Sequence, residues 1–359
     1  MTLAAISVPG TAAVRTDRAV GLWLFAIAGL IGVMVVVGGL TRLTGSGLSI
    51  TEWQPVTGVI PPLNLGGWQA EFAKYQGTPQ YELLNRGMGL AAFKTIYWWE
   101  WTHRMLGRLL GAVFLVPFVV FLWERRISGP IALRLLVIFV LGATQGLLGW
   151  WMVQSGLEGA RVAVSQYRLA AHLGLATVLF GYVFWTALEI SGARVTSLNK
   201  TPRFRSWAIG LVALIFVQIL LGAFMAGLDA GRAFATWPSY GGAFLPRGLY
   251  DLSPWWINHF ENPALVHFQH RSAGYLVAIL AVLLYLALRL AGADRPVRLA
   301  GTHVIVLVAT QIALGVFTVI SAVALPLAAL HQVCALALFA TALWWTYALI
   351  PQPWRGAAR

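Results

Sequence analysis

The feature that most constrains this chain is a series of eight apolar runs, each long enough to cross a lipid bilayer. The hydrocarbon layer is about 30 Å thick and a helix rises about 1.5 Å per residue, so about 20 apolar residues span it. Water is absent there, and each segment must therefore satisfy its own backbone hydrogen bonds. We predict an all-α integral membrane protein with spans near residues 20–40, 98–122, 131–152, 167–189, 207–228, 264–288, 300–322 and 327–349.

The composition favours a membrane protein over a soluble one. Charged residues make up 10% of the 359 residues and hydrophobic residues 59%, which leaves too little charge to cover the surface of a soluble domain. The net charge of +13 could suggest nucleic acid. The basic residues, however, fall in the segments between the apolar runs, where they set topology and contact anionic lipid. We therefore expect the lipid bilayer as a partner, and not nucleic acid.

The distribution of charge predicts the orientation in the membrane. Eight spans place both termini on one side, and that side receives more than half of the 25 Lys and Arg but only a third of the 12 acids. Because cytoplasmic loops carry an excess of Lys and Arg, both termini are predicted to be cytoplasmic. The first 19 residues are too polar for a signal peptide, and no transit peptide is visible, so we expect a multi-pass protein of a bacterial inner membrane.

The chain also repeats itself. Four features recur in the same order, 159 to 185 residues apart, and four spans per repeat give both copies one orientation. We therefore expect two pseudo-symmetric four-helix bundles, comprising residues 1–195 and 196–359. The matches are Gly47 to Trp53 with Gly231 to Trp237, Glu100 to Arg104 with His267 to Arg271, Ala143 to Gly149 with Ala309 to Gly315, and His172 with His331.

Four of the seven histidines occupy equivalent places in the even-numbered spans: His103, His172, His270 and His331. Each lies five to seven residues inside its span, which corresponds to roughly 8–11 Å below the outer surface. Two imidazoles on facing helices at one depth can ligate a haem iron from opposite sides. A single buried histidine would more commonly make an interhelical hydrogen bond. Four at matched depth favour two haem sites, with His103 and His172 in one half and His270 and His331 in the other.

Charged neighbours distinguish the two predicted sites. Glu100 precedes His103 by three residues and so shares its helix face, whereas the second half has His267 there. Glu100 could form an ion pair with Arg104, or it could handle protons and assist a ligand exchange. Arg104 and Arg271 each follow a proposed ligand, and they could bind haem propionates or extend to the interface.

Other metals are less well supported. Structural zinc prefers four nitrogen or sulfur ligands, and the chain has one cysteine, Cys334, so it also lacks an intramolecular disulfide. Copper held by histidines alone stays open. A transporter, which parallel repeats could serve, predicts broken helices and polar sites at the midplane, but the ionisable residues here gather near the outer face.

The chain resembles the haem A synthase family over nearly its whole length. The resemblance rests on the segment 38–49 (GGLTRLTGSGLS), the Glu-x-x-His-Arg motif at Glu100, and the four duplicated histidines. It implies an oxidoreductase that converts a methyl group of haem O to a formyl group by successive hydroxylation, giving haem A for terminal oxidases. Some bacterial members have cysteine pairs in outer loops. This chain has none, so it resembles the cysteine-poor proteobacterial and mitochondrial class, and no thiol-based role is expected.

The resemblance also implies residue roles and partners. His270 and His331 would bind haem b, which relays electrons, and the site of the substrate haem O would involve His103, His172 and Glu100. Haem O synthase and assembly factors of haem-copper oxidases are expected partners, and homo-oligomers are compatible with the sequence. The alternative is a bis-histidine membrane cytochrome b that only transfers electrons, for which Glu100 is not required.

A haem held by two histidines has no free iron position. If both His103 and His172 ligate the substrate iron, either one must leave or the oxidation must proceed through the ring. We hypothesise that Glu100 assists by moving a proton or by stabilising the displaced state.

Overall fold

The computed structural model describes residues 16–192 and 202–349. Within these ranges the regular structure is helical, apart from one isolated bridge between Tyr240 and Ala243. The parts of the termini used in the orientation prediction, residues 1–15 and 350–359, lie outside the described residues. So does the predicted boundary between residues 195 and 196.

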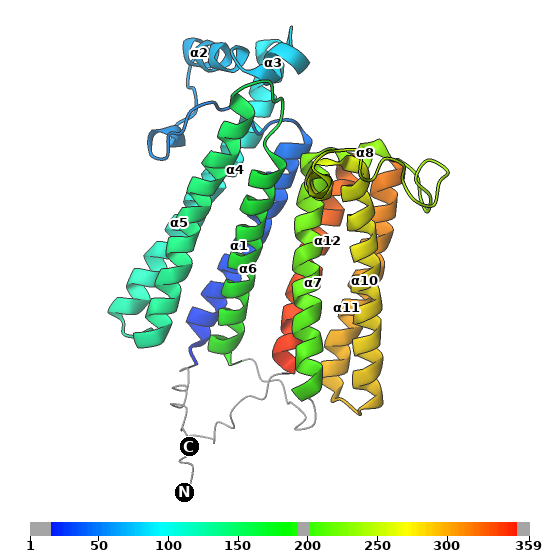
Figure 1. Ribbon diagram of the computed structural model, residues 1–359. Coiled ribbons are helices and arrows are strands. Elements are labelled where there is room, and N and C mark those ends of the chain that lie inside the picture. The colour runs from blue at the N-terminus through cyan, green and yellow to red at the C-terminus, as the bar shows by residue number, and fades with distance from the viewer. Residues whose placement is uncertain (1–15, 193–201, 350–359) are drawn as a thin grey trace, which may run out of the picture.

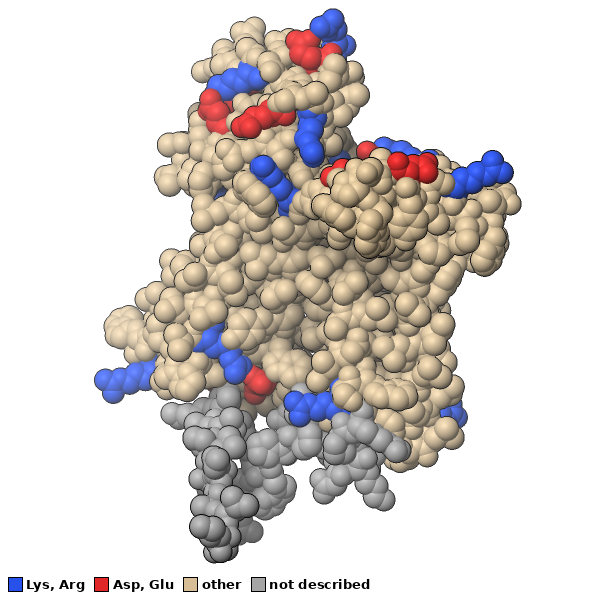
Figure 2. Space-filling view, viewed as in Figure 1, with Lys and Arg blue, Asp and Glu red and all other residues tan. Residues whose placement is uncertain are grey.

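Eight helices in the described residues are long and apolar enough to cross a membrane, which confirms the predicted number of spans. They are α1 (Arg18–Leu43), α4 (Leu90–Trp123), α5 (Gly129–Leu157), α6 (Gln166–Ser191), α7 (Pro202–Gly227), α10 (Pro263–Leu290), α11 (Arg295–Ile320) and α12 (Leu325–Ala348). On the face shown in Figure 2, Lys, Arg, Asp and Glu gather toward the two ends of the molecule and leave an uncharged band between them. Such a band is what hydrocarbon requires.

The eight helices form two groups of four. Helices α1, α4, α5 and α6 lie on one side of Figure 1, and α7, α10, α11 and α12 lie on the other. The groups meet through contacts of α6 with α7 and of α12 with both α1 and α6. Gln332 of α12 donates to the main-chain oxygen of Val35 in α1 at 2.7 Å, so one of these contacts is a half-buried hydrogen bond between the halves.

The loop between α1 and α4, which is the first outer loop in the predicted orientation, folds into a cap above α4 and α5 (Figure 1). It contains the 3₁₀ turn η1 (Thr57–Val59) and the short helices α2 (Leu65–Gln76) and α3 (Pro79–Leu84). An aromatic cluster of Trp68, Tyr75, Phe93 and Tyr97 joins the cap to α4. This cluster explains why α4 begins at Leu90, eight residues before the predicted span, since its first two turns pack against the cap instead of lipid.

The loop between α7 and α10 covers the second half at the same end of the molecule as the cap (Figure 1). Its regular elements are α8 (Ala230–Ala233), the 3₁₀ turn η2 (Trp255–Ile257) and α9 (Asn258–Glu261). Buried Asn258 fixes the turn by donating to the main-chain oxygens of Leu252 and Trp255. Asn262 caps α10 by accepting from the main-chain nitrogens of Ala264 and Leu265. The predicted spans leave long segments between residues 40 and 98 and between residues 228 and 264, but the short helices in these segments were not predicted.

At the opposite end of the bundle, ion pairs connect neighbouring segments. Asp17 caps α1 by accepting from the main-chain nitrogens of Ala19 and Val20, and it pairs with Arg126 of the loop between α4 and α5 at 2.7 Å. The Arg126 hydrogen bond and the two backbone donors hold the pKa of Asp17 below its ordinary value of 3.8. Arg134 of α5 pairs with Glu189 of α6 at this same end.

Candidate functional site

The second half brings two predicted ligands next to each other. His270 of α10 and His331 of α12 have ring centroids 6.3 Å apart, with the ring planes inclined by 70°. Two metal–imidazole bonds of about 2 Å, with about 1 Å from each bonding nitrogen to its ring centre, span about 6 Å. The separation therefore fits two imidazoles that share one iron. In the first half His103 lies on α4 and His172 on α6.

Each of the four histidine rings lies against a glycine of a neighbouring helix. A Cβ atom added to that glycine would come within 2.8–3.3 Å of the ring Cε1, which is too close for an unstrained contact. The glycines thus provide the space in which each ring sits, and they fix its direction. The four pairs are Gly38 with His103, Gly149 with His172, Gly222 with His270, and Gly315 with His331.

Glutamine amides accompany three of the rings. Gln145 Nε2 lies 3.1 Å from His172 Nδ1 and donates to the main-chain oxygen of His172 at 2.9 Å. Gln218 makes the same two contacts with His270, at 3.2 and 2.9 Å. Gln311 Nε2 lies 3.3 Å from His331 Nε2. Gln218 was not predicted from the sequence, although Gln218 and Gly222 have the same spacing as Gln145 and Gly149.

Several polar atoms around the rings lack a hydrogen-bond partner in the described part of the chain. They include Nδ1 of His103 and of His331, and Oε1 of Gln145, Gln218 and Gln311. Buried polar groups are usually paired, since leaving one unsatisfied costs about 1–3 kcal/mol. Neutral imidazoles on facing helices, with acceptor oxygens beside them, form a donor set that fits haem iron.

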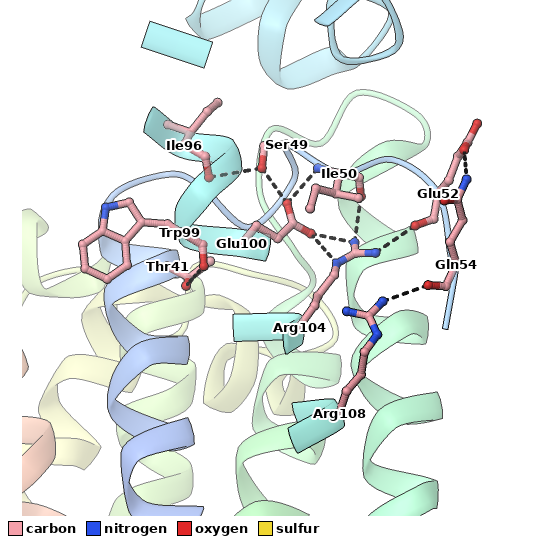
Figure 3. A network of polar contacts seen from close by, with 10 residues as sticks. All are labelled: Thr41, Ser49, Ile50, Glu52, Gln54, Ile96, Trp99, Glu100, Arg104 and Arg108. Carbon is pink, nitrogen blue, oxygen red and sulfur yellow. Dashed lines mark hydrogen bonds and ion pairs between the residues drawn. The ribbon is translucent and has the colours of Figure 1, made fainter. Parts of the chain in front are cut away.

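Glu100 of α4 lies in a complete polar network, shown in Figure 3. Its side chain is 3% exposed, and Oε2 accepts from Ser49 Oγ and from the main-chain nitrogen of Ile50, both at 2.8 Å. Oε1 accepts from Arg104 Nη2 at 2.6 Å, so the predicted ion pair is present. A buried carboxylate is tolerated when it is compensated in this way.

Arg104 extends the network into the first outer loop (Figure 3). Its guanidinium donates to the main-chain oxygens of Ile50 at 2.7 Å and Glu52 at 2.8 Å. One turn further along α4, Arg108 donates to the main-chain oxygens of Gln54 and Pro55. The segment between Ser49 and Pro55 is therefore bound to α4 by one carboxylate and two guanidinium groups.

The second half repeats this arrangement with a different acceptor. His267 is fully buried, and its Nε2 accepts from Arg271 Nε at 3.0 Å. Arg271 also donates to the main-chain oxygen of Thr236 at 2.6 Å and lies over the ring of Tyr240 at 4.3 Å. Loop groups thus engage both Arg104 and Arg271, and their contact with haem propionates stays a prediction.

The chain is similar to known proteins over most of its length. Residues 21–343 match the model of the family described as Cytochrome oxidase assembly protein. A haem A synthase of Parvibaculum lavamentivorans is 50% identical over 338 residues, covering 93% of this chain and 96% of the relative. One from Paracoccus denitrificans is 50% identical, covering 89% and 85%. One from Nitrosospira multiformis is 46% identical, covering 91% and 92%.

Proposed function

Because this chain belongs to the family of cytochrome oxidase assembly proteins, together with relatives named haem A synthase, we propose that it makes haem A by oxidising a methyl group of haem O to a formyl group. The oxidation proceeds by successive hydroxylation of one methyl carbon. The observation that carries the proposal is the pair of neighbouring imidazoles, His270 and His331, whose 6.3 Å separation suits one iron and whose arrangement on glycine recurs in the first half.

The second half is proposed to hold haem b through His270 and His331. When bound, haem b supplies one-electron transfer to the first half. The contribution of the chain is to fix both rings by the packing of Gly222 and Gly315 and to exclude water beneath the outer loop that Arg271 holds.

The first half is proposed to bind the substrate haem O between His103 and His172. The network of Glu100 and Arg104 holds the first outer loop over this half and limits the access of water. The two halves differ at Glu100 and His267, which supports a division between chemistry in the first half and electron transfer in the second. Glu100, one turn from His103, is the group that would move a proton or stabilise a displaced ligand.

The location and partners follow from the same proposal. The charged residues at the end opposite the histidines, including Arg125, Arg126 and Arg134, support an inner-membrane protein with that end in the cytoplasm. Haem O is hydrophobic and would be passed from the enzyme that makes it. Haem O synthase and the assembly factors of haem-copper oxidases are therefore the proposed partners.

The test is to express the protein with a source of haem O and to analyse the extracted haems. We expect formyl haem in cells with the wild-type chain and only haem O in cells with His172→Ala. If both strains return unchanged haem O while the purified protein still shows haem b, the chain is an electron-transfer cytochrome, and the proposed oxidation is wrong.

A further inference from the structure

The helices that pack against the four histidines share a local pattern. In each of them a residue stands four positions before the glycine that receives the ring, on the same helix face. That residue is Gln145 before Gly149, Gln218 before Gly222, and Gln311 before Gly315. In α1 the residue before Gly38 is Met34. Three of the histidines therefore have an amide at this position, and His103 has a thioether.

Met34 occupies the position in the first half that Gln218 occupies in the second half. A Cβ atom added at Gly274, four residues after His270, would come 3.4 Å from Gln218 Nε2. A Cβ atom added at Gly107, four residues after His103, would come 3.7 Å from Met34 Cε. Both side chains thus reach the same point of the facing helix, one turn beyond the histidine. The difference between methionine and glutamine changes the chemistry at this point, while both side chains pack against a glycine of the facing helix.

An amide at this point restrains the histidine in two ways. Gln145 and Gln218 each donate to the main-chain oxygen of their histidine and lie beside its ring. Alternatively, an imidazole that binds metal through one nitrogen keeps its proton on the other, and a partner for that N–H orients the ring and strengthens it as a ligand. After rotation of the amide, the buried, unpartnered Oε1 of each glutamine can accept a hydrogen bond from this N–H, in exchange for the bond to the main-chain oxygen.

Met34 offers neither restraint. A thioether has no donor and is a weak acceptor. Nδ1 of His103 has no hydrogen-bond partner among the described residues. Nδ1 of His331 is also unpartnered, but the amide of Gln311 lies 3.3 Å from the same ring. His103 is thus the ligand whose orientation depends on packing alone.

We propose that His103 is the displaceable ligand of the substrate haem and that Met34 is the positioning residue that leaves it displaceable. The inference rests on the proposed function and answers how a haem between two histidines can open an iron position. Release breaks only the coordinate bond. The electron pair returns to Nε2 of His103, and the oxidation state of the iron does not change.

The test uses carbon monoxide, which binds ferrous haem only at an open position, on the purified full-length protein loaded with haem O. Met34→Gln should lower carbon monoxide binding to haem O by about tenfold, which is the effect of one hydrogen bond to the ring. It should also shift the haem O spectrum toward the six-coordinate form. Val33→Gln, which adds the same amide at a half-exposed neighbouring position, should behave as wild type.

Equal carbon monoxide binding in wild type and Met34→Gln would overturn the inference. A second pair of variants decides if Met34→Gln does not fold. His103→Ala should retain haem O on His172 and bind carbon monoxide, whereas His172→Ala should lose most of its haem O. The reverse result would also overturn the inference. A wild-type protein that takes up no haem O would instead contradict the proposed function itself.

Discussion

Each of the four candidate ligands lies against a helix position that has no side chain. At Gly222 this position faces His270, where an added Cβ would come 3.3 Å from Cε1. Gly222→Val should therefore push the ring aside, and overpacking of this kind costs about 1–3 kcal/mol. We expect haem b occupancy at limiting haem to fall by about tenfold, measured from the absorption of the purified protein. Gly210→Val in the same helix has no atom within 4 Å of the added Cβ and should keep its haem b.

Glu100 combines two roles that a mutation can separate. Glu100→Ala removes both the proposed proton-handling group and the anchor of Ser49 and Ile50. We expect haem b to stay bound while haem O or a hydroxylated intermediate accumulates, with haem A falling about a hundredfold or more, as is typical of a lost acid–base group. Extraction and chromatography of the haems measure this. Glu100→Gln keeps an acceptor for the loop, and a normal haem A yield in it would assign Glu100 to anchoring alone.

The residues of the site were predictable to different degrees. His103, His172, His270 and His331 could be identified because their spacing repeats in the sequence. The ion pair of Glu100 with Arg104 was also predictable, but its other two hydrogen-bond donors, Ser49 Oγ and the main-chain nitrogen of Ile50, were not, because a loop brings them back onto α4. The equivalence of Met34 and Gln218 was not recognised from the sequence because the two residues differ in type, and the packing of α1 on α4 and of α7 on α10 makes it evident.

At the scale of elements, the first outer loop depends on Arg104. Its guanidinium binds the main-chain oxygens of Ile50 and Glu52 together with Glu100, a combination that a lysine ammonium cannot reproduce. Arg104→Lys should increase amide hydrogen exchange in the segment 45–55 by about tenfold, from the loss of about one hydrogen bond. Exchange in α2 should not change, since its aromatic contacts to α4 remain. An equal increase in hydrogen exchange in the segment 45–55 and in α2 would contradict this prediction.

The start of α1 should respond to pH through Asp17. Its pKa is lowered in the folded state by Arg126 and the backbone donors, so its contribution to stability is present above the ordinary value of 3.8 and is lost as the pH falls below it. We therefore expect the thermal unfolding temperature in detergent to fall more steeply below about pH 4 in wild type than in Asp17→Asn. Parallel curves for the two proteins would show that the ion pair has no such effect.

The boundaries of some helices were predictable from the sequence and those of others were not. The eight spans were predictable because hydrocarbon imposes a minimum apolar length, which is visible in any window of the sequence. The extension of α4 to Leu90 was not, because Phe93 and Tyr97 are buried by the cap and not by lipid. Helices α2 and α3 are short and lie in a loop rich in Gly and Pro, where local signals are weak.

At the scale of the whole molecule, the two groups of four helices carry different side chains at positions that correspond in the predicted repeat. Glu100 of the first half corresponds to His267 of the second, and Met34 corresponds to Gln218. Both differences fall on the helices around His103, whereas the second half keeps an amide at each ring. The asymmetry supports a rigid electron-transfer site beside a site whose ligand can move.

Contacts between the halves keep the two sites in a fixed relation. Arg42 at the end of α1 pairs with Asp229 at 3.3 Å, and Gln332, next to His331, binds α1 at Val35. Gly39 makes room for Gln332 beside Gly38, which receives His103. The segment 35–39 of α1 therefore contacts His103 of the first half and Gln332, the neighbour of His331, in the second half.

The absorption spectrum of the purified full-length protein, reduced with dithionite, tests the central claim most directly. The arrangement of imidazoles predicts the spectrum of a low-spin haem b that persists in His103→Ala and disappears in both His270→Ala and His331→Ala. A colourless preparation from cells rich in haem, or an unchanged spectrum in His270→Ala, would contradict it.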